Sequence, residues 1–91
     1  MRTRLAESET GSRLGAVSGW AREGNWIRKE FRFASFAESI GFVNRVAQIA
    51  EQLDHHPDID VRYDRVRLLT STHSAGGLTE LDFDLARRID D

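Results

Sequence analysis

The 91-residue chain has no cysteine, one proline, one methionine and no long hydrophobic run. Without cysteine it can form neither a disulfide framework nor a thiolate metal site, so a metal could bind only through histidine and carboxylate side chains. The formal net charge of −2 gives no general attraction to nucleic acid or to an anionic membrane. The run from Met1 to Gly15 is charged and has no apolar segment, which predicts a cytoplasmic protein without signal peptide or membrane anchor.

The length predicts one domain over residues 1–91 that buries roughly 60–65% of its unfolded surface, so its core is thin. Hydrophobic periodicity and turn residues predict the elements in turn. They are a short helix over about Leu5–Val17 interrupted by Gly11 and Gly15, a hairpin from Trp20 through the turn Glu23–Asn25 to Phe33, a helix over Ser35–Leu53, a hairpin of Ile59–Tyr63 and Arg65–Thr72, and a closing helix capped by Thr79. This order, (α)ββαββα, predicts an α+β fold with a four-stranded antiparallel sheet and helices on one face.

The helix over Ser35–Leu53 has a wide apolar surface. Ser35 and Glu38 have capping-box spacing at its start, and its apolar residues fill an arc of about 180°, where about 100° suffices to seat a helix on a sheet. The surplus either meets a second subunit or makes two contacts within one monomer. The outer face of the sheet carries Arg28, Arg32, Arg62 and Arg67, and Glu30 interrupts this positive charge. We interpret that face as solvated rather than as a nucleic-acid platform, because no aromatic pair is placed to stack on bases.

All three histidines lie in two short stretches, Asp54-His55-His56-Pro57 and Thr72-His73-Ser74. Pro57 favours extended geometry at His56, so both adjacent histidines leave the end of a helix, and His73 follows the last strand. We expect the three to meet at one edge of the sheet, with Glu51 one turn before His55. Imidazoles on different sides of a cleft suit proton transfer to and from a small polar molecule.

Two other interpretations of the histidines are weaker. They could only cap a helix end and line a loop, but three imidazoles beside a proline make that the minority view. Three imidazoles and a carboxylate could also bind zinc. Neighbouring residues in an extended chain point in opposite directions, however, and the i, i+4 histidine pair of helical zinc motifs is absent.

At these residues the chain resembles the pterin-4a-carbinolamine dehydratases. The resemblance covers about four-fifths of the chain and joins His55-His56-Pro57 with Ser71-Thr72-His73 and Gly77-Leu78-Thr79-x-x-Asp82 at matching separations. It implies the same antiparallel sheet with helices on one face, a homodimer or homotetramer, and no metal or organic cofactor. The implied reaction removes water from 4a-hydroxytetrahydrobiopterin to give quinonoid dihydrobiopterin, which recycles the cofactor of an aromatic amino acid hydroxylase in the same pathway.

The resemblance also implies residue roles. His55, His56 and His73 would be the catalytic imidazoles. The residues implied to form the pterin site are Glu51, Pro57, Thr72, Ser74, Ala75, Asp82 and Trp20, with Glu51 and Asp82 placed to orient imidazoles or the pterin. Asp82 could equally only cap the last helix, and a buried tryptophan such as Trp20 is more often a core residue. Ile59 stands where the family often has an aromatic residue, which affects affinity more than reaction type. Two rival functions are a partner-binding protein on the same scaffold and a small metal-binding protein.

Overall fold

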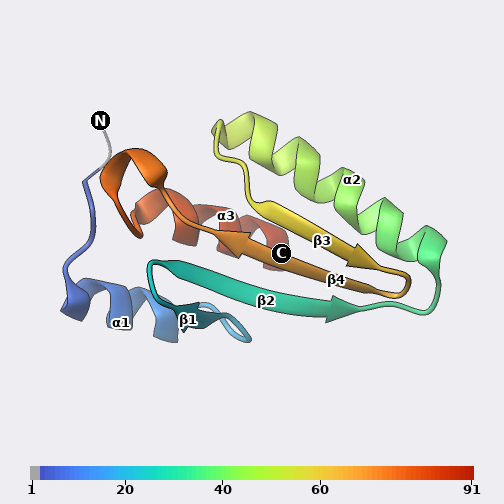
Figure 1. Cartoon of the computed structure of the whole chain (residues 1–91), viewed down its shortest axis with the longest axis horizontal. Coiled ribbons are helices and arrows are strands. Elements are labelled where there is room, and N and C mark those ends of the chain that lie inside the picture. Colours follow the sequence, from blue (N-terminus) through green and yellow to red (C-terminus); the bar gives the residue numbers. More distant parts are fainter. Residues whose placement is uncertain (1–2) are drawn as a thin grey trace.

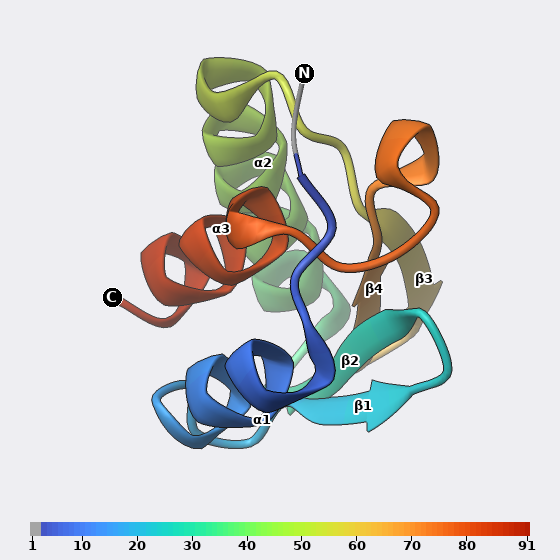
Figure 2. The same ribbon diagram turned by 90° about the vertical axis from the view of Figure 1, so that its left-hand side faces the viewer.

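The computed structural model describes residues 3–91, and within them four strands form one antiparallel sheet. The elements are α1 (Glu7–Gly15), β1 (Ala21–Glu23), β2 (Trp26–Arg32), α2 (Phe36–Leu53), β3 (Asp58–Arg62), β4 (Arg65–Thr70), the 3-10 turn η1 (His73–Ala75) and α3 (Glu80–Asp90). The strand order is β1-β2-β4-β3 (Figure 1). The α-helices of the described region all lie on one face of the sheet (Figure 2). The predicted α+β fold and element order are confirmed.

Alternation of residues along the two central strands separates the faces of the sheet. Ile27 of β2 and Val66, Leu68 and Thr70 of β4 are fully buried beneath the helices. Their neighbours in the chain point to the opposite side, since side chains alternate across a strand. The core also receives Phe83, Leu85 and Ile89 from α3, and Val46 from α2. The thin core therefore lies between the inner face of the sheet and the helices.

Helix α2 begins where the sequence predicts. Ser35 is extended, and its hydroxyl accepts a hydrogen bond from the Glu38 amide at 3.2 Å, which satisfies one of the free amides of the first turn. The second half of the expected capping box, from the Glu38 carboxylate back to the Ser35 amide, does not form among residues 3–91. The hydroxyl alone caps this helix.

The end of α2 is set by Asp54 rather than by Pro57 alone. Asp54 adopts a left-handed conformation with φ of 51°, a region that aspartate tolerates better than most residues. The amides of Asp54 and His55 then donate to the carbonyls of Glu51 and Ala50 at 3.3 and 3.0 Å. This Schellman-type closure turns the chain before the proline is reached. It directs His55 away from the helix axis.

Two boundaries differ from the prediction. Helix α1 runs through Gly11 without interruption, because buried Thr10 and an Arg13–Glu80 ion pair of 2.5 Å fix it to the rest of the protein, and such packing outweighs weak helix propensity. Strand β4 ends at Thr70 rather than Thr72. Thr72 instead pairs with Gly77 across the η1 turn, with the Thr72 amide 2.9 Å from the Gly77 carbonyl.

Within residues 3–91 no helix combines the length and the apolar character needed to cross a bilayer. Cytoplasmic location stays a prediction. Among the described residues three large apolar side chains are exposed, Phe36 at 49%, Ile59 at 37% and Tyr63 at 68%. The rings of Phe36 and Tyr63 stack with centroids 6.3 Å apart. Of these three, only Phe36 belongs to α2, so most of the large apolar side chains of that helix are at least half-buried within the single chain.

The left-handed residue at the end of α2 is testable by substitution. Asp54→Gly should leave the free energy of unfolding within about 1 kcal/mol of the original, because glycine adopts this conformation without strain. Asp54→Val should lower it by about 1–3 kcal/mol, since a β-branched residue is strained there. Urea denaturation measures both. The control Gln48→Val, at an exposed position within α2, should cost no more than about 0.7 kcal/mol. Equal losses for Gly and Val would contradict the assignment.

Candidate active site

The carboxylate of Asp82 lies at the start of α3 and is completely buried. Its Oδ2 accepts from the Thr79 amide at 3.0 Å, while the Thr79 hydroxyl accepts from the Leu81 amide at 3.2 Å. This capping arrangement explains why α3 begins at Glu80. Asp82 therefore caps α3, which is one of the two roles expected for it from the sequence. Its carboxylate also contacts side chains from outside this helix.

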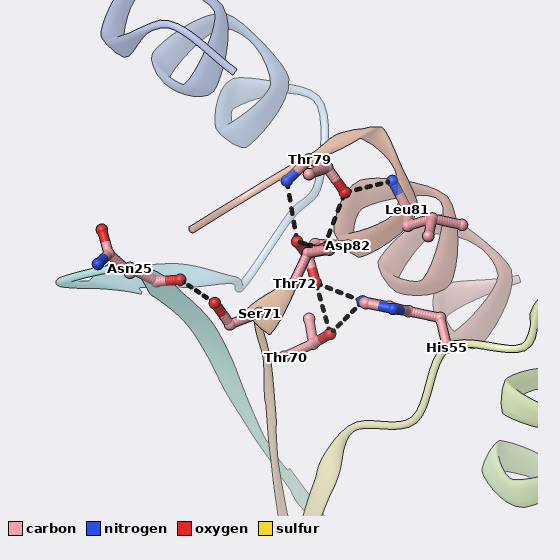
Figure 3. A network of polar contacts seen from close by, with 8 residues as sticks. All are labelled: Asn25, His55, Thr70, Ser71, Thr72, Thr79, Leu81 and Asp82. Atoms are coloured by element: carbon pink, nitrogen blue, oxygen red, sulfur yellow. Dashed lines mark hydrogen bonds and ion pairs between the residues drawn. The ribbon is translucent and has the colours of Figure 1, made fainter. Parts of the chain in front are cut away.

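Three side chains from other parts of the chain converge on the same carboxylate (Figure 3). His55 Nε2 lies 2.6 Å and Thr70 Oγ1 2.7 Å from Oδ1, and Thr72 Oγ1 lies 2.9 Å from Oδ2. Thr79 Oγ1 is 2.8 Å from Thr72 Oγ1 and can donate to it, because the Thr72 hydroxyl gives its own proton to Asp82. Every buried side-chain nitrogen and oxygen of the described residues has a hydrogen-bond partner. A fully satisfied network of this kind fixes its members in place.

Two opposing effects act on the pKa of Asp82. Burial raises it, because a charged carboxylate loses its hydration. Hydrogen bonds from His55, Thr70, the Thr79 amide and Thr72 favour the ionised form and together outweigh burial, so the pKa lies below its usual value of 3.8. Asp82 is therefore an anion at neutral pH, and it faces an imidazole.

The network assigns the proton on His55. Asp82 is ionised and can only accept, so Nε2 of His55 carries the hydrogen that bridges the 2.6 Å contact. The Thr70 hydroxyl already donates to Asp82, so its 3.2 Å contact with Nε2 is one in which Thr70 accepts. The second ring nitrogen, Nδ1, forms no hydrogen bond with any residue between 3 and 91. His55 thus has one nitrogen fixed and one left for another group.

The local fold explains why these residues meet. The Asp54 turn directs His55 off the end of α2, and alternation places Thr70 on the buried face of β4. The pairing of Thr72 with Gly77 then folds the chain back so that α3 starts beside both. Figures 1 and 2 show the α2–β3 connection and the η1 turn at the same end of the molecule. The end of α2 therefore meets the end of β4, as predicted, while the three histidines have different surroundings.

His56 lies on the surface and pairs with the still more exposed carboxylate of Glu51, in the last turn of α2. Ion pairs at such exposed positions contribute little to stability. Pro57 is half-buried between His56 and β3. The arrangement leaves His56 free to meet a ligand from solvent.

His73 begins the η1 turn and contacts a different partner. Its ring meets the edge of Trp26 with centroids 5.5 Å apart and planes at 79°. A hydrogen bond of 2.5 Å from the Ser71 hydroxyl to the Asn25 carbonyl ties the start of this segment to the β1–β2 turn (Figure 3). Ser74 is exposed and Ala75 half-buried in the same turn. The segment leading into η1 is therefore fixed to the β1–β2 turn, while the side chain of His73 stays exposed.

Trp20 is not brought to the histidines. It is buried in the core, stacks edge-on with Phe31, and donates from its indole nitrogen to Asp90 at 3.0 Å. Asp90 and Asp82 lie at opposite ends of α3, about 12 Å apart along a helix. In this single chain Trp20 is a core residue, the alternative recognised for it from the sequence.

Sequence reasoning missed Thr70 and Trp26. A polar residue at an inward position of β4, in line with Val66 and Leu68, was the available signal for Thr70, because a buried hydroxyl needs a partner. Nothing in the local pattern indicated that Trp26 would meet His73.

Among residues 3–91 no group of three or more histidine or acidic side chains is arranged to hold a metal ion. The absence of a metal from the reaction stays a prediction.

Comparison with known proteins agrees with this geometry. The family model described as pterin 4 alpha carbinolamine dehydratase matches residues 3–91, and the chain belongs to that family. A protein of Roseiflexus sp. (strain RS-1) is 54% identical over 91 residues, which cover 100% of this chain and 98% of the relative. One from Sulfolobus acidocaldarius is 50% identical over 86 residues, covering 94% of each chain. Both carry the provisional name pterin-4-alpha-carbinolamine dehydratase.

Two solved structures are also similar. A crystal structure described as a transcriptional coactivator/pterin dehydratase from Brucella melitensis has a TM-score of 0.92 and 40% identity, covering 97% of this chain and 96% of that one. A pterin dehydratase-like protein described as a RuBisCO assembly factor in the alpha-carboxysome has a TM-score of 0.67 and 25% identity, covering 79% and 86%. Proteins of similar structure are therefore described by enzymatic and by assembly roles.

The buried carboxylate makes a prediction about pH. Because the folded-state pKa of Asp82 is lowered, its charge stabilises the fold above the usual value of 3.8, and this stabilisation is lost as pH falls through the lower folded-state pKa. Asp82→Asn should lower the free energy of unfolding at pH 7 by about 1–3 kcal/mol, because its amide group faces other donors. The difference from the original protein should shrink as the pH is lowered below 3.8.

Urea denaturation at a series of pH values measures this difference. Asp84→Asn is the matched control, since Asp84 lies on the same helix in a half-exposed pair with Arg87. It should change the free energy of unfolding by no more than about 0.5 kcal/mol. A loss for Asp82→Asn that stays constant down to the lowest pH would show that the carboxylate is not ionised in the folded protein.

Proposed function

We propose that this protein catalyses the dehydration of a 4a-hydroxytetrahydropterin, with 4a-hydroxytetrahydrobiopterin as the substrate that the family resemblance implies. The observation that carries the proposal is the His55–Asp82 pair at 2.6 Å, in which a buried anion holds one ring nitrogen and leaves the other available. An imidazole oriented by a carboxylate is a common arrangement for proton transfer, because the carboxylate fixes the tautomer and stabilises the protonated ring. Family membership supports the same reaction class.

The proposed reaction needs two proton transfers and no change of oxidation state. One imidazole delivers a proton to the 4a-hydroxyl as the C4a–O bond breaks, and the oxygen leaves as water. Another takes the proton from ring nitrogen N5, and the N5–H electron pair forms the N5=C4a double bond of the quinonoid dihydropterin. An aromatic amino acid hydroxylase would supply the substrate. Groups with pKa values near neutrality suit both transfers.

We assign the transfers to the three histidines. His55 would exchange a proton at Nδ1, with Asp82 balancing the charge when the ring is protonated. His56, paired with Glu51, and His73, against Trp26, would approach the flat pterin from other sides. Backbone and side-chain contacts from Pro57, Thr72, Ser74 and Ala75 would hold the ring. Thr72 has its hydroxyl committed to Asp82, so its contribution would be through the backbone.

A second candidate function is partner binding on the same scaffold. The stacked, exposed rings of Phe36 and Tyr63 favour it, because single exposed aromatics are common but a stacked pair forms a surface suited to contact with protein. The descriptions of the Brucella and alpha-carboxysome proteins add a precedent for such roles. Both functions could belong to one protein, since the surface and the histidines involve different residues.

The catalytic proposal is tested with chemically generated 4a-hydroxytetrahydropterin. The protein should accelerate its dehydration, and His56→Gln should reduce the rate by about 10²–10⁴ because one general acid or base is lost. Substitution of His56 gives the clearest test of the three histidines, because its side chain is 56% exposed and the variant should fold normally. Asp84→Asn serves as the control with unchanged activity. A rate for the unmodified protein no faster than in buffer would refute the enzyme and favour the partner-binding candidate.

Assembly is a separate proposal. The thin core and the exposed surface of Phe36, Ile59 and Tyr63 lead us to expect a homodimer or homotetramer at micromolar concentration. Light scattering should give two or four times the chain mass of 10.4 kDa. Replacing Phe36 and Tyr63 together by serine should shift the population toward monomer, whereas the Gln48→Val control should not. A monomer of the unmodified protein would argue that the surplus apolar surface has no partner copy.

A further inference from the structure

No helix of the described region covers the outer face of the sheet (Figure 2). That face carries a row of arginines. Arg32 of β2 is directly opposite Arg65 of β4, and Arg65 is directly opposite Arg62 of β3. All three point outward, since Val66, the neighbour of Arg65, is fully buried on the inner face. We call Arg32, Arg65 and Arg62 the arginine row.

Like charges directly opposite one another destabilise a sheet, because facing Cβ atoms lie only about 4.5–5.5 Å apart. The adjacent row of the sheet partly relieves this repulsion, because it places two carboxylates, Glu30 and Asp60, on either side of Arg67. Glu30 and Asp60 approach Arg32 and Arg62 at 3.9 and 3.6 Å, each within its own strand. Arg65 and Arg67 have no ion pair within residues 3–91. The two rows together keep an excess of two positive charges on a chain whose net charge is −2.

Five of these six residues line a shallow depression of about 190 Å³: Glu30, Asp60, Arg62, Arg65 and Arg67. Drug-sized ligands occupy pockets of about 300–1,000 Å³, so this space suits one small group rather than a bicyclic pterin. Its floor is firm, because Arg62 and Arg65 flank the β3–β4 turn, where the Asp64 carbonyl accepts from the Phe33 amide at 2.8 Å. The sheet register therefore fixes the spacing of the backbone positions from which these arginine side chains project.

We propose that Arg62 and Arg65 of the arginine row, together with Arg67, bind the phosphoryl group of a small phosphate monoester. Guanidinium groups donate in a planar fork that matches phosphate oxygens, and several of them around one point suit a dianion with three terminal oxygens. Such an anion would offset the repulsion within the row. The flanking carboxylates limit the site to one group and disfavour a long polyanion such as nucleic acid.

A soluble ligand fits this face better than a lipid headgroup. Membrane-surface binding uses apolar side chains beside the basic ones. The exposed apolar residues Phe36, Ile59 and Tyr63 do not lie on the outer face: Ile59 is opposite inward-facing Leu68, and Tyr63 stacks on α2 through Phe36. The arginine row is also remote from the histidines, since Arg65 and Thr70 are separated by about 17 Å of strand.

The test is a titration of the full chain followed by the backbone amide signals in NMR spectra. Inorganic phosphate and glycerol 3-phosphate are the probes, and sodium chloride at equal ionic strength is the reference. We expect saturable shifts confined to residues 30–32 and 60–67 with both phosphates. Arg65→Gln should weaken phosphate binding by at least about tenfold. The affinity of Arg65→Lys should lie between those of Arg65→Gln and the unmodified protein, because lysine keeps the charge but lacks the planar pair of donors.

The matched control is Arg28→Gln. Arg28 lies on the same face but pairs with Glu23 at 2.9 Å and stands two rows away, so its removal should change phosphate affinity by less than about twofold. Shifts that chloride reproduces, that do not saturate, or that centre on Arg87 and Arg88 of α3 would overturn the proposal. So would flotation with vesicles containing phosphatidic acid when free phosphate has no effect. Dehydration of the pterin should be the same in Arg65→Gln and the unmodified protein.

Discussion

The buried charge of Asp82 is the constraint on which the described structure depends. A carboxylate removed from water must be surrounded by donors, and here they come from the end of α2, the end of β4, the segment after it and the first turn of α3. Each of these segments is therefore held at one place by the same ion. Removing any donor would leave the buried charge less well stabilised, so the network holds α3 in place against the sheet. The same carboxylate thus caps the helix and orients His55.

The turn at Asp54 gives two neighbouring histidines different environments. With Asp54 left-handed, His55 points into the buried network and His56 remains at the surface beside Glu51. A rigid imidazole beside an accessible one is a useful combination for a reaction that gives one proton and takes another. The exposed imidazole can adapt to a ligand while the buried one keeps its tautomer.

The two faces of the sheet have separate chemistry because side chains alternate along each strand. On β4, Val66, Leu68 and Thr70 build the core and reach the buried carboxylate, while Arg65 and Arg67 lie outside on a face without helices. One strand thus contributes to the candidate active site at its end and to the arginine row at its beginning. Changes to the outer face can be made without disturbing the network around Asp82.

The sequence by itself determined the α+β fold, the element order and the edge of the sheet where the histidine segments meet, because periodicity, turn residues and Pro57 are local signals. It also indicated both roles of Asp82 without deciding between them. Only the tertiary structure decided that Asp82 both caps α3 and contacts His55, and that Thr70 also donates to it. It also decided that His73 contacts Trp26 and that Trp20 belongs to the core. These outcomes depend on strand register and on which donors reach a buried charge, and such long-range contacts leave no trace in the spacing of neighbouring residues.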